Sequence, residues 1–178
     1  MSTQGPRYRV AVASVGLALS LLVGSPNLTP QKAVAISGGG LDYAGLNLTG
    51  KDFSKGQYKS KKDFSGAIAK EANFQGSDLR GVRFFKSDLK AADFTSANLA
   101  NASLEGADLE GTILKNAVVT GSYFSESVSQ VGDISGADFT EALIRQDIQM
   151  ALCKRADAKG TNPVTGVATR ESLLCDMF

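Results

Sequence analysis

The chain has no histidine and no tryptophan among its 178 residues. It therefore lacks the usual side chain for acid–base catalysis near neutral pH, His-based catalytic triads and His-ligated metal sites. Its two cysteines are too few for a four-Cys zinc site or a disulfide-dense mini-protein. Neither sign of charge is in excess, because 19 basic residues face 18 acidic ones. This balance indicates neither a nucleic-acid binder nor a highly charged tail, and the length suits one ordinary domain.

Residues 1–35 have the pattern of a cleaved export signal. Basic residues precede a 14-residue apolar run over 10–23, which is short for a membrane span of about 20 residues. An A-x-A motif follows, and we expect cleavage between Ala35 and Ile36. An uncleaved membrane anchor is the alternative. After cleavage, residues 36–40 form a Gly-rich linker and the mature chain has 16 basic and 18 acidic residues.

A five-residue unit recurs without a gap from residue 62 to residue 146. The centre of the unit is Phe, Leu, Ile or Val in 15 of its 17 copies. A small residue lies two positions earlier, and Asp or Asn often lies between the two. Four more units precede this run, the last of them centred on Tyr58. The next centre, Phe64, follows after six residues, which indicates one inserted residue that forms a bulge or adjusts a corner.

A period of five matches neither a helix nor a strand. Because one such unit cannot bury its own apolar residue, the units have to stack. Four units per turn give a square coil, with the large and the small residue pointing inward. Residues 20 apart then lie above one another, so Phe64 and Phe84 share one inner column, and Phe74 and Phe94 share the opposite one. Aliphatic residues fill the two remaining columns.

Two features of the repeat leave alternatives open. The segment 125–131 keeps the five-residue phase but has Ser129 where an apolar centre is expected. It is either a loop that loosens one side of the coil or an ordinary imperfect repeat. The recurrent Asp and Asn residues suit the capping of backbone turns, and a carboxylate ladder for Ca²⁺ is the alternative.

The C-terminal residues 140–178 predict a helical cap for the open end of the coil. We expect one helix of about 15–18 residues that starts at Thr140 as N-cap, and a short second helix from Arg170 to about Asp176, capped by Thr169. Cys153 and Cys175 fall on these two helices. In an exported protein such a pair indicates a disulfide; a regulatory thiol switch and two unpaired buried thiols are the alternatives.

The repeats over residues 41–146 closely resemble the pentapeptide-repeat family. The resemblance implies an all-β solenoid, a right-handed quadrilateral β-helix, with a small α-helical C-terminal cap. The run from Cys153 to Cys175 is similar to the two-Cys cap of the thylakoid lumenal and cyanobacterial members. It implies a soluble, monomeric protein of the thylakoid lumen, or alternatively of a bacterial periplasm. Only nine residues precede the apolar run, which favours a cyanobacterial or plastid-encoded precursor.

The sequence offers no nucleophile–base pair, metal site or cofactor loop, so we do not expect an enzyme, a cofactor or a nucleic-acid partner. We expect a rigid, photosynthesis-associated interaction scaffold for a protein in the lumen or at a thylakoid membrane complex. A redox-responsive module that switches through Cys153 and Cys175 is the alternative. A DNA mimic of the gyrase-protecting type is a remote alternative, opposed by the export signal and the small net charge.

Two groups of outward residues are candidates for docking. Lysines 51, 55, 59, 61 and 62 give the first coil a basic edge, which either blocks edge pairing as a solvated face or docks an acidic partner. Apolar side chains at outward positions either bind a partner or pack under the terminal loops; these are Ile68, Phe85, Ile113, Val118 and Tyr123. The candidate docking residues are Lys59, Lys61, Lys62 and Phe85.

Overall fold

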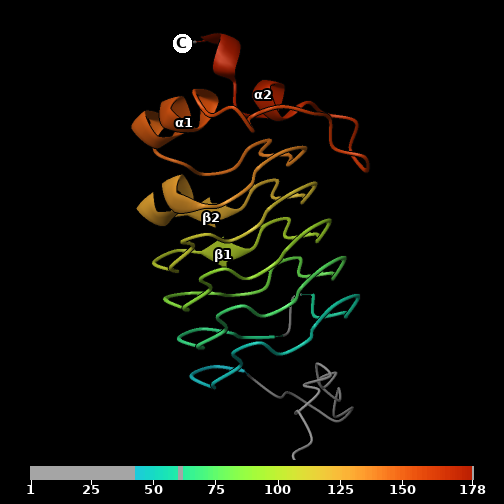
Figure 1. The fold of residues 1–178 in the computed structure, drawn as a ribbon, viewed down its shortest axis with the longest axis vertical. Helices are drawn as coiled ribbons and strands as arrows, with labels where there is room; N and C mark the ends of the chain where they lie inside the picture. The colour runs from blue at the N-terminus through green and yellow to red at the C-terminus, as the bar shows by residue number, and fades with distance from the viewer. Residues whose placement is uncertain (1–42, 60–61, 178) are drawn as a thin grey trace, which may run out of the picture.

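The computed structural model describes residues 43–59 and 62–177. The expected signal over 1–35, the linker over 36–40 and the cleavage site at Ala35 and Ile36 lie outside these residues. The described chain winds into a stack of coils along the long axis of the molecule (Figure 1). The first coil lies at one end of the stack, and the helices of the C-terminal segment lie at the other.

The coils pair through parallel bridges at a constant register. From Asp63 onward the bridged residues are 20 apart, as in Asp63↔Arg83, so each turn of the coil contains four five-residue units. Before the insertion the bridged residues are 21 apart, as in Asp52↔Asn73, which confirms the extra residue between Tyr58 and Phe64. Only strands β1 (Ser103–Leu104) and β2 (Tyr123–Phe124) exceed a single bridge, because a corner interrupts each side of the coil.

Each corner is a tight turn that begins at the inward central residue. At one such corner, the amide of Ala67 donates to the carbonyl of Phe64 at 3.0 Å, and Gly66 between them has φ 65°. A positive φ at the third position is the mark of a type II turn, which favours glycine. Glycine occupies nine such positions and other residues occupy eight. The recurrence of glycine two residues after the centre therefore follows from backbone conformation.

The Asp and Asn of the repeat cap these turns. The Oδ1 atom of Asp63 accepts a hydrogen bond from the amide of Ser65 at 2.8 Å, and Asn73 does the same for Gln75 at 3.0 Å. The same bond recurs in most units, at Asn47, Asp52, Asp78, Asp88, Asp93, Asn98, Asp108, Asp133 and Asp138. These side chains satisfy the one amide of the unit that faces outward, as expected of Asx turns.

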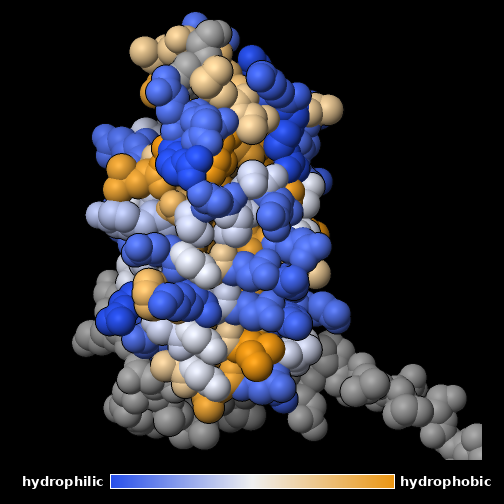
Figure 2. Space-filling view, turned by 90° about the vertical axis from the view of Figure 1, so that its left-hand side faces the viewer, coloured by the Kyte–Doolittle hydropathy of each residue, from blue (hydrophilic) through white to orange (hydrophobic). Residues whose placement is uncertain are grey.

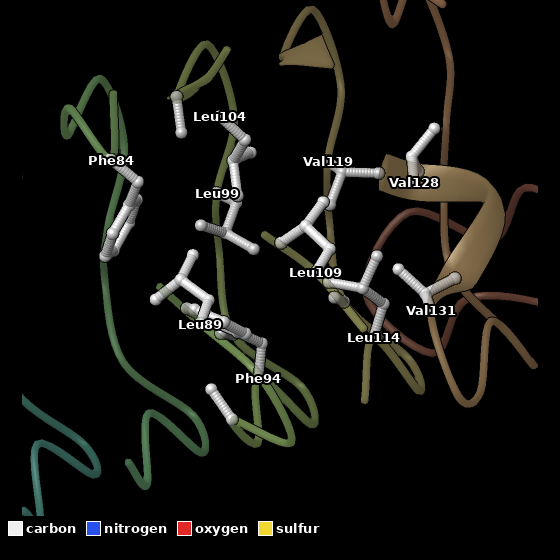
Figure 3. Close-up of a cluster of buried hydrophobic side chains, with 14 of the residues drawn as sticks. Phe84, Leu89, Phe94, Leu99, Leu104, Leu109, Leu114, Val119, Val128 and Val131 are labelled. Carbon is white, nitrogen blue, oxygen red and sulfur yellow. The ribbon is translucent and has the colours of Figure 1, made fainter. Parts of the chain in front are cut away.

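Two stacks of aromatic rings fill the N-terminal half of the bore. Phe64 and Phe84 stack with centroids 5.0 Å apart, and Phe74 and Phe94 stack at 4.7 Å. The two stacks meet edge to face, since Phe74 and Phe84 lie 5.7 Å apart with their planes at 85°. The predicted Phe columns are thereby confirmed. Leucine and valine continue the bore toward the C-terminus (Figure 3).

The side of the coil over residues 125–131 is replaced by a single 3₁₀ turn, η1 (Glu126–Gln130). Ser129 is exposed, whereas Val128 and Val131 are buried. The loosened side is therefore confirmed, and the imperfect-repeat alternative is wrong. Because a 3₁₀ turn advances the chain differently from a pentapeptide, two flanking valines reach the bore in place of a central residue.

The cap differs from the expected pair of helices. Helix α1 spans only Gln146–Cys153, with Arg145 as its N-cap, so the prediction of a long helix starting at Thr140 is wrong. Residues 140–144 complete the last coil instead, as the bridge between Tyr123 and Leu143 shows.

The second predicted helix is also interrupted. Helix α2 covers Thr169–Ser172, with Ala168 as N-cap, and the 3₁₀ turn η2 covers Cys175–Met177. Between them Leu174 has φ 55°. This left-handed residue stops the helix that was expected to reach Asp176.

Candidate interaction surfaces

Charge is polarised along the axis of the coil. Residues 43–91 contain ten Lys or Arg and five Asp or Glu, whereas residues 92–177 contain six and twelve. Because the chain rises steadily along the stack (Figure 1), the N-terminal half of the molecule is basic and the C-terminal half is acidic. The near-zero net charge of the whole chain conceals this separation, which orients the molecule in the field of a charged partner.

Three of the four candidate docking residues lie among the described residues. Lys59 is exposed and lies 4.0 Å from Asp78, and Lys62 is half-buried; Lys61 lies outside the described residues. Both described lysines precede the side that starts at Phe64. Phe85, one residue after the buried centre Phe84 of the next coil, is 36% exposed, with Lys86 Nζ 5.0 Å from its ring centroid. The three described candidates therefore all belong to the basic half of the molecule.

The outward apolar residues fall into two classes. Ile68, Phe85 and Tyr123 are exposed, whereas Ile113 is half-buried. Val118 is only 7% exposed, which does not fit a partner-binding surface and agrees with the alternative of packing under a terminal loop. Figure 2 shows small, separate hydrophobic groups on a largely hydrophilic face.

At the N-terminal opening of the bore, tyrosines close the ring stacks. Tyr43 stacks on Phe64 with centroids 4.5 Å apart, and Tyr58 packs edge to face against Phe53 at 5.8 Å. Burial, with smaller contributions from Tyr43 and Asp52, raises the pKa of Tyr58 to about 12. The phenol is therefore neutral at physiological pH, and the positive charge of this end comes from the surrounding lysines.

Two hollows lie in the C-terminal half. One has a volume of about 460 Å³ and lies beside η1, where Ser125, Glu126 and Asp108 contribute to its lining. The other has a volume of about 470 Å³ and lies between the last coil and α2, with Glu141, Glu171 and Leu174 in its lining. Within residues 43–59 and 62–177, no group of three or more Asp, Glu or Cys side chains is arranged to hold a metal ion. No helix in the same ranges is long and apolar enough to cross a membrane.

The cap provides hydrogen-bond acceptors for amides of the last coil that face the C-terminal end of the stack. The amide of Ile134 donates to Asp157 Oδ2 at 3.0 Å, that of Gly136 to the carbonyl of Lys159 at 2.9 Å, and that of Phe139 to Ser172 Oγ at 3.0 Å. Hydrogen bonding from Arg155 is the largest effect that lowers the pKa of Asp157. Open sheet edges template aggregation, and here the cap occupies the edge.

Asn162 joins the loop after α1 to the coil. It is 1% exposed. Its Nδ2 group donates to the carbonyls of Asn116, Ala117 and Gly136, at 3.2, 3.1 and 2.9 Å. Its Oδ1 accepts from the amides of the loop residues Val164 and Thr165. The loop therefore contacts the two residues that precede Val118, which agrees with the alternative that Val118 packs under a terminal loop.

The disulfide between Cys153 and Cys175 ties α1 to η2. The three acceptors that bond the last coil, on Asp157, Lys159 and Ser172, lie between these two cysteines, which are 22 residues apart. Asn162 lies in the same segment. Nothing in the five-residue pattern predicts these contacts.

Comparison with known proteins identifies the family. A family model described as pentapeptide repeats matches residues 60–84 and 87–127 in eight copies. The crystal structure of a pentapeptide repeat protein from the Arabidopsis thaliana thylakoid lumen is 40% identical, with a TM-score of 0.70. The alignment covers 75% of this chain and 91% of that one. The chain belongs to the pentapeptide-repeat family.

Pentapeptide-repeat proteins fold as right-handed quadrilateral β-helices, which agrees with four units per turn here. Two Arabidopsis thaliana relatives match shorter segments. "Thylakoid lumenal 15 kDa protein 1, chloroplastic" is 52% identical over 44 residues, or 25% of this chain and 19% of that protein. "Thylakoid lumenal protein TL20.3, chloroplastic" is 57% identical over 42 residues, or 24% and 14%. The chain thus spans less than a fifth of the length of these two curated relatives.

Proposed function

We propose that this pentapeptide-repeat protein is a non-enzymatic, monomeric scaffold of the thylakoid lumen that docks a protein partner of a photosynthetic membrane complex. The proposal includes export by the signal over residues 1–35. Three similar proteins are lumenal by name, which supports the location. The observation that carries the docking role is the basic N-terminal half, where Lys86 lies over the ring of exposed Phe85 and Ile68 is also exposed.

The physical argument starts from rigidity. Each coil is fixed to its neighbours by backbone hydrogen bonds and by a buried column of side chains on every side. Because the backbone of such a tube is already ordered, it loses little conformational entropy when a partner binds. More of the free energy of the contacts then contributes to affinity. An acidic partner surface is attracted to the basic half and repelled by the acidic half, which fixes the orientation of the complex.

A pull-down from thylakoid membranes tests this proposal. We expect a variant with Lys55, Lys59 and Lys62 changed to Glu to lose the partner, and a charge-matched variant with Lys115, Lys154 and Lys159 changed to Glu to retain it. Equal recovery by both variants would contradict docking at the basic half. A Phe85→Ser variant should weaken recovery without lowering the melting temperature, because Phe85 lies outside the bore.

A redox-responsive module is a second candidate, favoured by the position of the disulfide. The groups that pair with the last coil all lie between Cys153 and Cys175, so reduction frees the segment that covers the edge. Redox titration of the purified protein separates the two functions. A switch requires a potential above about −300 mV, whereas a purely structural bond lies below it.

A further inference from the structure

The hollow of about 470 Å³ at the C-terminal end is a feature that the proposed scaffold role does not use. It lies where the corner of the last coil meets α2, and its lining consists of Thr140, Glu141, Val167, Glu171, Ser172 and Leu174. Ser172 and Thr140 are already engaged: the Ser172 hydroxyl accepts from the Phe139 amide and donates to the Thr169 carbonyl, and the Thr140 hydroxyl donates to Asp138 Oδ1. The groups that remain for a ligand are therefore two apolar side chains and two carboxylates.

The two carboxylates carry uncompensated charge. Glu141 and Glu171 are both exposed, and neither makes an ion pair with any described residue. They come from separate elements, the coil corner and α2, and they line the same hollow. The surrounding half of the molecule has twice as many acidic as basic residues. Local and regional charge therefore both attract a cation.

Leu174 is an unusual choice at its position. It has φ 55°, where glycine or asparagine is favoured, and it is 50% exposed. Its neighbours Leu173 and Cys175 are both buried, which explains why the backbone reverses there. It does not explain an exposed leucine, because a polar left-handed residue would satisfy the same backbone. Backbone strain combined with exposed apolar surface is typical of binding sites.

We propose that this hollow docks a basic, amphipathic peptide segment of a partner protein. Apolar side chains of the segment pack on Val167 and Leu174, and Lys or Arg side chains pair with Glu141 and Glu171. Two residues after Glu141, Leu143 is exposed together with its register partner Tyr123. This site is independent of the basic half, so the protein has one docking surface of each charge.

Fluorescence anisotropy with a short labelled peptide of alternating leucine and lysine tests the site. We expect binding of this peptide and none of the matched leucine–glutamate peptide. The E141Q/E171Q double variant should weaken binding about fivefold, the size expected for two exposed ion pairs. An E71Q/E105Q variant removes the same charge elsewhere, with Glu71 at an equivalent left-handed corner, and should leave affinity unchanged. An equal loss in both variants would overturn the proposal.

Leu174→Asn separates binding from stability. Asparagine tolerates the left-handed conformation, so we expect the melting temperature to stay the same or rise while peptide affinity falls. Unchanged affinity in this variant would refute the role of Leu174 in the hollow. Sedimentation velocity tests whether the hollow instead binds the basic half of a second copy of this chain. Self-association that E141Q/E171Q abolishes would overturn the assignment to a separate partner.

Discussion

The hydrogen bonds of Asn162 make it the position where one side chain should matter most to the cap. The Asn162→Ala variant removes the Nδ2 donor from three carbonyls and the Oδ1 acceptor from two loop amides. An amide nitrogen has two hydrogens, so the three donor contacts represent about two full bonds. Four bonds at about 1 kcal/mol each predict a loss of about 4 kcal/mol in the free energy of unfolding.

The assay is urea denaturation followed by circular dichroism, with two further variants. Val164→Ala, in the same loop but 73% exposed, should change stability by less than about 0.5 kcal/mol. Asn162→Asp retains the acceptor but directs a carboxylate at three carbonyl oxygens, so it should be at least as destabilising as alanine. If the free energy of unfolding of Asn162→Ala lies within about 0.5 kcal/mol of that of the parent, this side chain does not hold the loop.

Three other perturbations test the bore and the cap. Phe84→Ala should cost roughly 3–5 kcal/mol, because the ring is fully buried, stacked on Phe64 and packed edge to face against Phe74; an unchanged melting temperature would count against its inward placement. The folded-state pKa of Asp157 is lowered, chiefly by Arg155, so its contribution is present above the ordinary value of 3.8 and lost as pH falls through the folded value. The protection of the Ile134 amide against hydrogen exchange, taken relative to its intrinsic rate at each pH, should therefore fall in acid, and Asp157→Asn should reduce that fall. Replacing Cys153 and Cys175 by serine should cost about 3 kcal/mol by loop entropy, measured by denaturation, and a loss below about 1 kcal/mol would show that the cap folds without the bond.

The sequence predicts the coil because the coil repeats one local solution. One five-residue unit determines which position points inward, which position is small and which residue caps the turn. The positions assigned from Phe64 and Phe74 therefore apply to the other units of the stack. The inserted residue after Tyr58 is visible for the same reason, as a change in spacing. The loosened side at Ser129 is visible as a missing apolar centre.

The cap and the candidate sites could not be predicted from the repeated unit. The starting point of α1 depends on whether Leu143 pairs with Tyr123, which is a contact between coils and not a local preference. Val118 has the pattern of an outward residue and is buried because a distant loop lies beside it. The hollow at Leu174 requires two elements far apart in the chain to meet, and no spacing in the sequence encodes that meeting.

Amide hydrogen exchange resolved by residue is the most direct test of the four-unit coil. Most amides of a unit bond to backbone carbonyls, but in most units the amide just after the centre bonds to a surface Asx side chain instead, as at Ser65, Gln75 and Thr95. The coil therefore predicts fast exchange at every fifth residue, separated by protected amides. Continuous protection without that period, as in a helix, would contradict the fold and every surface derived from it.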